Sequence, residues 1–296
     1  MTKELDFNEK NKRARIKLIV TRVLSYTFLI VLTLFCLSFF YLLIINSTKS
    51  NADLLDVTKT LLPSVHFFKN FYNTLFRPSS TYVNVLSGLK NSMIVALLSS
   101  LLTCYFSSLT AYGVYAYNFK GKKIVAAFIL AIMMIPSQLS SVGFLEMAYS
   151  LKLRNQLWLL IVPSIAAPAT YYYMHQYLKA TLPLELIEAS RMDGSNEFMT
   201  FNRIVLPIMK PALAVQMIFS FVASWNNYYM PGLLLDKTNK TTLPIMLGLL
   251  RSDAVAKVDN GQIWMVILLS ILPVIVIYLI LSRSIIKGVT SGSVKG

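Results

Sequence analysis

The chain has 296 residues, 55% of them hydrophobic, and carries a formal net charge of +15. A soluble domain of this length does not need so much apolar material, whereas apolar runs of about 20 residues are typical of transmembrane helices. The positive charge does not indicate nucleic-acid binding, because the basic residues cluster at the ends of the apolar runs, where they set membrane topology. The sequence therefore predicts an all-α, polytopic protein that resides in a lipid bilayer and has no nucleic-acid partner.

The first predicted span covers residues 23–45, a run without a charge that follows a basic N-terminal tail, residues 1–22. A cleaved signal peptide would have a shorter apolar region and a small-residue cleavage site, and the following INSTKSNAD offers no such site. We therefore expect a retained span. The loop that completes segment 23–90 is too short for a separate domain, but amphipathic pieces such as HFFKNFYNTLF can lie at the outer membrane interface.

Five further spans are predicted within a helical core, residues 91–285, and a C-terminal tail follows at 286–296. The spans cover residues 91–117, 124–149, 157–178, 206–235 and 263–281. Neighbouring helices of a bundle can satisfy the backbone groups that proline frees, so prolines inside or near these spans are compatible with them. The loops on the side of the N-terminal tail hold the denser share of lysine and arginine. The sequence thus predicts six transmembrane helices with both termini in the cytoplasm.

The second predicted span carries small residues at a regular spacing. Ser99, Thr103, Ser107 and Ala111 recur every four positions. Small residues at this spacing let helix backbones approach closely in a membrane. Helix packing is the favoured interpretation, and a polar pore lining is the alternative.

Residues that enzymes and metal sites require are scarce. Both cysteines, Cys36 and Cys104, lie inside apolar runs, and the two histidines, His66 and His175, are far apart in the chain. The nearest approach to a nucleotide-binding G-x-x-x-x-G-K-[ST] motif is FKGKK at 119–123, which lacks the first glycine and the hydroxyl residue. We therefore predict no catalytic residue, cofactor or metal site, and no enzyme activity in the chain itself.

The stretch PLELIEASRMDGSNEFMTFNRIVLP, residues 183–207, is charged although apolar spans flank it. We expect Thr181 to cap a helix that runs to about Met192, and Gly194 to adopt the left-handed conformation that ends helices. Ser195 is expected to cap a second helix, with Glu197 near its positive dipole end. The second helix should present one apolar face, formed by Phe198, Phe201 and Val205. Such a cytoplasmic loop, 181–207, is either a docking element for a partner or simply an amphipathic loop.

This stretch resembles the EAA signature of bacterial ABC importer permeases, in which E-A-A is followed by D-G and then by I-x-L-P. The matching positions are Glu188, Ala189, Ser190, Asp193, Gly194, Ile204, Leu206 and Pro207, with Ser190 where alanine is usual. The resemblance implies that the first helix is a coupling helix seated in a cleft of a cytoplasmic ATPase. It also implies that Glu188 and Asp193 contact the ATPase, that Gly194 shapes the turn, and that Leu206 and Pro207 anchor the loop to the fifth span.

Two further stretches resemble carbohydrate importer permeases of the maltose type. SFVASWNNYYMPGLLL matches the W-N-x-[FY]-x-x-P-L element at Trp225, Asn226 and Pro231, with Gly232 in place of leucine. The C-terminal tail matches at Gly288, Gly292, Val294, Lys295 and Gly296, with Ser282 where glutamine is usual. The resemblance implies a subunit of an ATP-driven sugar importer in the bacterial cytoplasmic (inner) membrane. Its implied partners are a second homologous permease, two cytoplasmic ABC ATPase subunits and an extracytoplasmic sugar-binding protein.

Candidate substrate contacts lie in the fifth and third predicted spans. Amide groups hydrogen-bond hydroxyls and aromatic faces pack on sugar rings, which favours Trp225, Asn226 and Asn227. The alternative is that Trp225 belongs to an interfacial aromatic belt with the neighbouring tyrosines. Glu146, the only carboxylate within a predicted span, is a second candidate, although it can equally pair with Lys152 or Arg154.

Three other functions stay open at the level of the sequence. A permease of the same superfamily for polyamines, phosphate or peptides would share the loop signature. An ATP-independent secondary transporter or channel would be expected to show matched halves, and no internal repeat is visible. A membrane scaffold or receptor has only the spans in its favour.

Overall fold

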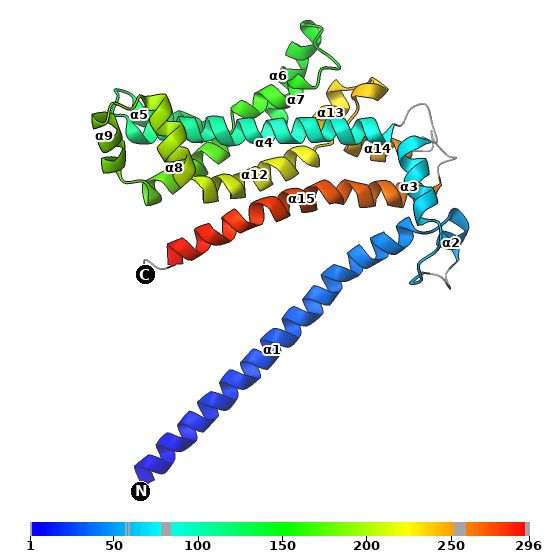
Figure 1. Cartoon of the computed structure of the whole chain (residues 1–296), viewed down its shortest axis with the longest axis horizontal. Coiled ribbons are helices and arrows are strands. Elements are labelled where there is room, and N and C mark those ends of the chain that lie inside the picture. Colours follow the sequence, from blue (N-terminus) through cyan, green and yellow to red (C-terminus); the bar gives the residue numbers. More distant parts are fainter. Residues whose placement is uncertain (1, 57, 59, 78–83, 252–258, 294–296) are drawn as a thin grey trace. The chain divides into compact units, whose positions relative to one another are not determined.

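The computed structural model describes residues 2–56, 58, 60–77, 84–251 and 259–293 (Figure 1). Helix is the only regular secondary structure among them, which confirms the all-α prediction. The chain divides into two compact units. Unit 1 comprises Met1–Phe71 with Asp259–Leu268, and unit 2 comprises Tyr72–Val258 with Leu269–Gly296.

Unit 1 contains α1 (Thr2–Ser47), α2 (Asn51–Leu55), the start of α3 (Phe67–Phe76) and the first turns of α15 (Asn260–Ser293). Ser50 and Asp53 form a capping box at the start of α2. The Asn70 side-chain amide donates to the carbonyl oxygens of Ser47 and Lys49, both at 2.9 Å, and thereby fastens α3 to the end of α1. The predicted amphipathic piece HFFKNFYNTLF thus becomes helix α3.

Unit 2 is built around α4 (Val85–Ala116). Three of its small polar residues face a segment made of α7 (Trp158–Ile161), a 3₁₀ turn (Val162–Ile165) and the start of α8 (Pro168–Thr181). Their hydroxyls donate to carbonyls there: Ser99 to Leu160 at 3.3 Å, Thr103 to Ser164 at 2.9 Å and Ser107 to Ala167 at 3.4 Å. The four-residue spacing therefore serves helix packing, and it also supplies donors to a stretch of chain that is not continuously helical.

Three described helices are long and apolar enough to cross a membrane: Arg15–Ser47, Val85–Ala116 and Asn260–Ser284. Two bent pairs also qualify if each pair counts as one span. The pair Lys122–Met133 and Gln138–Ser150 is bent by 93°, and the pair Glu197–Ile208 and Lys210–Trp225 by 81°. By length and composition the described residues thus hold three to five spans, and the predicted six remain a prediction.

The third, fourth and fifth predicted spans are not single helices, which corrects the sequence expectation. The third divides into α5 (Lys122–Met133) and α6 (Ser137–Ser150), with Pro136 at the break. The fourth is interrupted before α8, where Pro163 is the second residue of the 3₁₀ turn and Pro168 begins α8. The physical reason is that proline lacks the N–H that a continuous helix needs and clashes with the preceding turn.

The fifth predicted span consists of α11 (Leu206–Ile208), α12 (Lys210–Trp225) and α13 (Tyr229–Leu234). A 3₁₀ turn, Thr238–Lys240, and α14 (Leu243–Leu250) follow. Before α11 lie α9 (Leu184–Met192), α10 (Glu197–Thr200) and a π-helical turn, Phe201–Val205. Figure 1 shows α8 and α9 gathered at the end of α4 that leads into α5, so the charged loop sits at one end of unit 2.

Candidate coupling site

The charged loop forms the expected helix, turn and second helix, but with different caps. Helix α9 ends at Met192, and Gly194 has a φ of +76°, as predicted. Thr181 does not cap α9: it is the last residue of α8, where its hydroxyl donates to the Tyr177 carbonyl at 2.8 Å, and Pro183 precedes α9 instead. A hydroxyl engaged in the preceding helix is not available to the next one.

The second cap is Asn196, not Ser195. The Asn196 side-chain oxygen accepts from the backbone N–H of Met199 at 2.8 Å. The Ser195 hydroxyl instead accepts from Thr200 at 3.1 Å, and the Thr200 hydroxyl lies 3.0 Å from that of Ser190. Ser190, the position where alanine is usual, is buried and links α9 to α10 through this chain of hydroxyls. The two helices are therefore joined by side chains as well as by the turn.

Helix α9 has one face in the core and one face outside it. Ile187 and Ser190 are buried, whereas Glu188 and Ala189 are exposed. Asp193 and Gly194, in the turn, are exposed too. The outward surface of the loop thus carries the residues that the sequence resemblance assigns to a partner, while the other face fixes their position.

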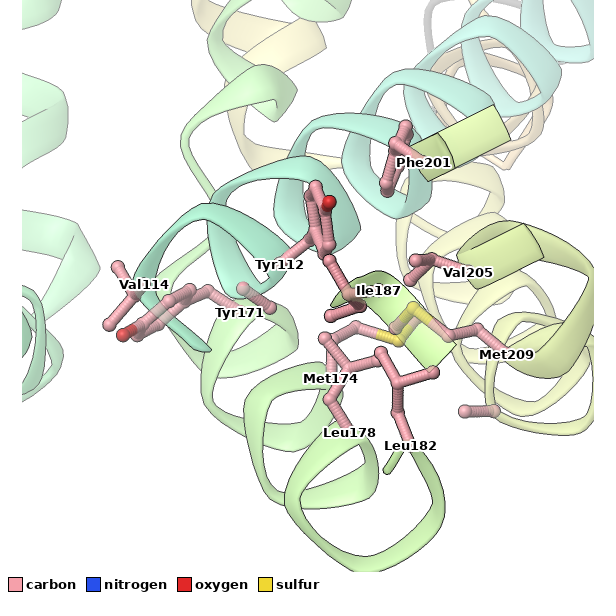
Figure 2. Close-up of a cluster of buried hydrophobic side chains, with 12 residues drawn as sticks. Tyr112, Val114, Tyr171, Met174, Leu178, Leu182, Ile187, Phe201, Val205 and Met209 are labelled. Carbon is pink, nitrogen blue, oxygen red and sulfur yellow. The ribbon is translucent and has the colours of Figure 1, made fainter. Parts of the chain in front are cut away.

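A cluster of buried hydrophobic side chains supports the inner face of α9 (Figure 2). It includes Ile187 from α9, Met174 and Leu178 from α8, and Phe201 and Val205 from the π-helical turn. Burial of large apolar side chains supplies about 1.5–3 kcal/mol each.

The predicted apolar face is only partly correct. Phe201 and Val205 are fully buried, but Phe198 is 68% exposed. Phe201 packs against the rings of Tyr105 and Tyr112 of α4, whereas Phe198, three positions earlier, lies outside this contact.

Sequence reasoning missed the polar contacts that hold the turn. Arg191 Nε lies 2.7 Å from Glu197 Oε1, and the Tyr112 hydroxyl donates to Glu197 Oε2 at 2.7 Å. The Arg191 guanidinium lies 5.4 Å from the centre of the Tyr117 ring, within reach of a cation–π contact. The hydrogen bond to Glu197 raises the pKa of Arg191. The only signal in the sequence is the opposite charge of Arg191 and Glu197 on the two sides of the predicted turn.

The pathway candidates fall in different environments. Trp225 is buried, stacks on Phe221 and donates its indole N–H to the Ser270 carbonyl at 3.0 Å, so this chain itself covers the ring. Asn226 is exposed at the end of α12. Asn227 lines a cavity of about 360 Å³ together with Ser140, Ser141 and Phe144 of α6 and with residues of α7, the 3₁₀ turn and α13. Both asparagines lie at the break between α12 and α13, where the half-buried Asn227 accepts a hydrogen bond from the backbone N–H of Met230 at 3.3 Å.

Glu146 is exposed on α6 and does not line that cavity. The suggested pairing with Arg154 is replaced by an ion pair between Arg154 and Asp236 at 2.8 Å. Hydrogen bonding with Asn155 lowers the pKa of Asp236. Cys36 is exposed and Cys104 buried. Within the described residues, no three His, Cys, Asp or Glu side chains gather in a way that could hold a metal ion.

Three long apolar helices and two bent helix pairs indicate an integral membrane protein. Residues 103–290 match the family described as "Binding-protein-dependent transport system inner membrane component". The chain belongs to this family, and its place is accordingly the cytoplasmic membrane.

Curated relatives match over nearly their whole length. The chain is 34% identical over 282 residues to the arabinooligosaccharides transport system permease protein AraQ of Bacillus subtilis (strain 168), covering 94% of this chain and 97% of the relative. It is 32% identical over 261 residues to the melibiose/raffinose/stachyose import permease protein MelC of the same organism, covering 87% and 91%.

A solved structure of a bacterial ABC transporter involved in the import of the acidic polysaccharide alginate shares the fold. The TM-score is 0.75 with 20% sequence identity, and the match covers 88% of this chain and 96% of that one. At this identity the likeness supports the fold alone.

Proposed function

We propose that this chain is the transmembrane permease subunit of an ATP-driven ABC importer that carries a sugar or oligosaccharide delivered by an external binding protein. The observation that carries the proposal is the family match over residues 103–290, which includes the charged loop, together with relatives whose names specify oligosaccharides. The chain itself hydrolyses no ATP in this scheme. Hydrolysis takes place on two cytoplasmic ATPase subunits.

The proposed topology has six spans with both termini in the cytoplasm. Segment 1–22 is the inner tail, 23–90 the first span with its outer loop, 91–285 the five-helix core and 286–296 the inner C-terminal tail. Of the C-terminal residues that carry the family resemblance, Val294, Lys295 and Gly296 lie outside the described residues. Loop 181–207 then faces the cytoplasm, where the ATPase subunits are.

In this scheme α9 is the coupling helix. Its exposed face, with Glu188 and Ala189, sits in a cleft of an ATPase subunit, and Asp193 contacts the same subunit at the turn. Gly194 allows the sharp turn because glycine adopts its positive φ without strain, whereas a residue with a side chain would be strained there. Leu206 and Pro207 connect the loop to α12. A short helix that packs on the core at one face can transmit ATP-driven motion to the spans.

The translocation pathway lies between this chain and a second, homologous permease. Asn226 and Asn227 offer amide groups to sugar hydroxyls, and Trp225 acts as a positioning residue that fixes the end of α12 against α15. Glu146 on α6 is a more distant candidate contact. The external binding protein meets segment 235–261, of which residues 252–258 lie outside the described residues.

The composition of the importer can be tested by isolating the tagged chain from its host in a mild detergent and identifying its companions by mass spectrometry. We expect an ABC ATPase, a second permease of this family and a sugar-binding protein. A chain that is recovered alone or as a homodimer in several mild detergents would contradict the proposal and favour an ATP-independent transporter.

The coupling role of α9 can be tested with Glu188→Lys and Gly194→Val in the reconstituted importer. We expect both variants to insert normally and to lose sugar transport, because one reverses the charge on the docking face and the other strains the turn. Gly143→Val is a matched control, since a Cβ at Gly143 would meet nothing within 4 Å. Uptake of labelled sugar and ATP hydrolysis are measured together, and normal transport by either loop variant would show that the coupling assignment is wrong.

A further inference from the structure

The last two turns of α4 carry two tyrosines that reach the two ends of α9. The Tyr115 hydroxyl donates to the Leu182 carbonyl at 2.7 Å, just before α9 begins. The Tyr112 hydroxyl donates to Glu197 Oε2 at 2.7 Å, just after the turn that ends α9. Residues three apart lie on the same face of a helix. One face of α4 therefore holds the charged loop at both ends.

The contact between Tyr112 and Glu197 extends to α9, because Glu197 also pairs with a residue of that helix. Its two carboxylate oxygens serve different elements: Oε2 accepts from Tyr112 of α4, and Oε1 pairs with Arg191 of α9 at 2.7 Å. Hydrogen bonds to an ionised acceptor are short and about twice as strong as neutral ones. The Glu197 carboxylate, a single rigid group, thus joins α4 to α9.

Packing keeps Tyr112 in place for this contact. Tyr112 is 2% exposed, and its ring lies 5.6 Å from that of Phe201, four residues after Glu197. Figure 2 shows Tyr112, Ile187 and Phe201 in one buried cluster. Ring and hydroxyl of the same tyrosine therefore contact the same short segment.

The covalent route from the loop to α12 is less direct. The segment Glu197–Ile208 meets Lys210–Trp225 at an angle of 81°, with Pro207 and Pro211 on the two sides of the bend. The helix axis is interrupted at these prolines, so the loop and α12 do not form one straight helix. The hydrogen bonds from Tyr112 and Tyr115, in contrast, join α4 directly to the loop.

We propose that Tyr112 and Tyr115 form a two-point clamp through which α4 moves together with α9. Both are positioning residues that act through the coupling helix. The clamp rests on the proposed function, because it presumes that an ATPase displaces α9. The clamp further means that a displacement of α9 moves α4, the central helix of unit 2. This route exists in addition to the bent connection from the loop to α12.

The test uses Tyr112→Phe, Tyr115→Phe and the double variant in the complete importer, reconstituted with its ATPase and binding protein. Each change removes one hydroxyl and leaves the ring packing intact. Tyr171→Phe is the matched control, since Tyr171 belongs to the same buried cluster and its hydroxyl has no hydrogen-bond partner among the described residues. ATP hydrolysis, sugar uptake and thermal stability are measured for all four variants.

We expect ATP hydrolysis to persist, because the exposed face of α9 is unchanged. Sugar moved per ATP should fall at least about tenfold in the double variant, because one charge-assisted and one neutral hydrogen bond are lost. The control should match the wild type. A double variant that moves as much sugar per ATP as the control would overturn the clamp. So would a fall in ATP hydrolysis and transport that merely parallels a loss of thermal stability.

A distance measurement gives a readout that a purely structural role would not change. Spin labels are placed at Met192 of α9 and Leu101 of α4, both exposed, after Cys36 and Cys104 are replaced by alanine. We expect the label separation to stay constant between ATP-free and ATP-bound states in the background protein and to change in the double variant. A separation that changes already in the background protein would contradict the clamp.

Failure of the clamp and failure of the proposed function can be told apart. If Gly194→Val abolishes transport while the tyrosine variants transport normally, only the clamp is wrong. If wild-type importer transports sugar without ATP, the proposed function itself is wrong.

Discussion

Helices α1 and α4 are both long and apolar, yet they are packed very differently within their own units. In the most apolar 18-residue stretch of each, 44% of α4 is buried but only 11% of α1. In α1, large side chains such as Phe28 and Leu34 are exposed on all sides, and burial begins only near its last turn. Length and hydropathy therefore establish that a helix can lie in a membrane, whereas the size of its side chains decides whether it packs inside the protein.

The small residues of α4 explain the difference. Serine, threonine and alanine allow neighbouring backbones to approach, and their hydroxyls satisfy carbonyl groups of an interrupted helix. A helix with large apolar residues all round instead has a surface suited to lipid or to another protein chain. The contrast leads to three substitutions, ordered from the largest expected effect to the smallest.

The largest effect is expected from Ser108→Leu in α4, compared with Ser38→Leu in α1. Both serines donate to a carbonyl of their own helix at 2.7 Å, but Ser108 is fully buried and Ser38 is exposed. Overpacking should lower the free energy of unfolding by about 3 kcal/mol for the change at Ser108 and leave it nearly unchanged for the change at Ser38. Thermal unfolding in detergent measures both, and equal losses of stability would remove the proposed distinction between the two helices.

An intermediate effect is expected from Gly261→Ala, at the start of α15. Like α1, α15 is sparsely buried along its apolar stretch, at 11%. Its first turn is an exception, because a Cβ at Gly261 would clash with the Lys49 carbonyl oxygen and lie 2.7 Å from Asn70 Nδ2. We expect the free energy of unfolding to fall by about 2 kcal/mol, as for other overpacked sites. Gly143→Ala, which meets no neighbour, is the control, and an unchanged melting temperature for Gly261→Ala would refute the close approach.

The smallest effect is expected from Thr103→Val, which keeps the side-chain shape and removes one hydroxyl. Thr103 donates to the Ser164 carbonyl at 2.9 Å, whereas Thr33 in α1 donates only to Leu29 of its own helix. Loss of one interhelical hydrogen bond should cost about 1 kcal/mol. Thr33→Val is the control, and the difference between the two melting temperatures isolates the contribution of the contact between helices.

Much of the fold could be predicted from the residues alone. The all-helical class and the spans that correspond to α1, α4 and α15 followed from uninterrupted apolar runs. The end of α9 at Met192 and the turn at Gly194 followed from local chemistry, because glycine readily adopts a positive φ. The four-residue spacing in α4 also led to the correct interpretation, helix packing.

The site was less accessible to such reasoning. Asn196, not Ser195, caps α10, because the two polar residues compete locally and only the contact of Ser195 with Thr200 decides between them. Trp225 was expected at a sugar or at the membrane interface, and it is buried because α15 offers the Ser270 carbonyl beside it. Each outcome depends on a partner that is distant in the chain or on competition between neighbours.

By itself the sequence determined that this protein is a helical membrane protein with a charged helix–turn–helix loop, because hydropathy and turn residues act over a few neighbouring positions. The tertiary structure decided at which prolines the predicted spans break, since Pro273 lies inside the continuous α15, and it alone decided which helices the loop contacts. Tyr112 and Glu197 are 85 positions apart, and no local pattern could pair them. Their contact exists because α4 and the loop pack on a shared core, and packing depends on the shape of the whole unit.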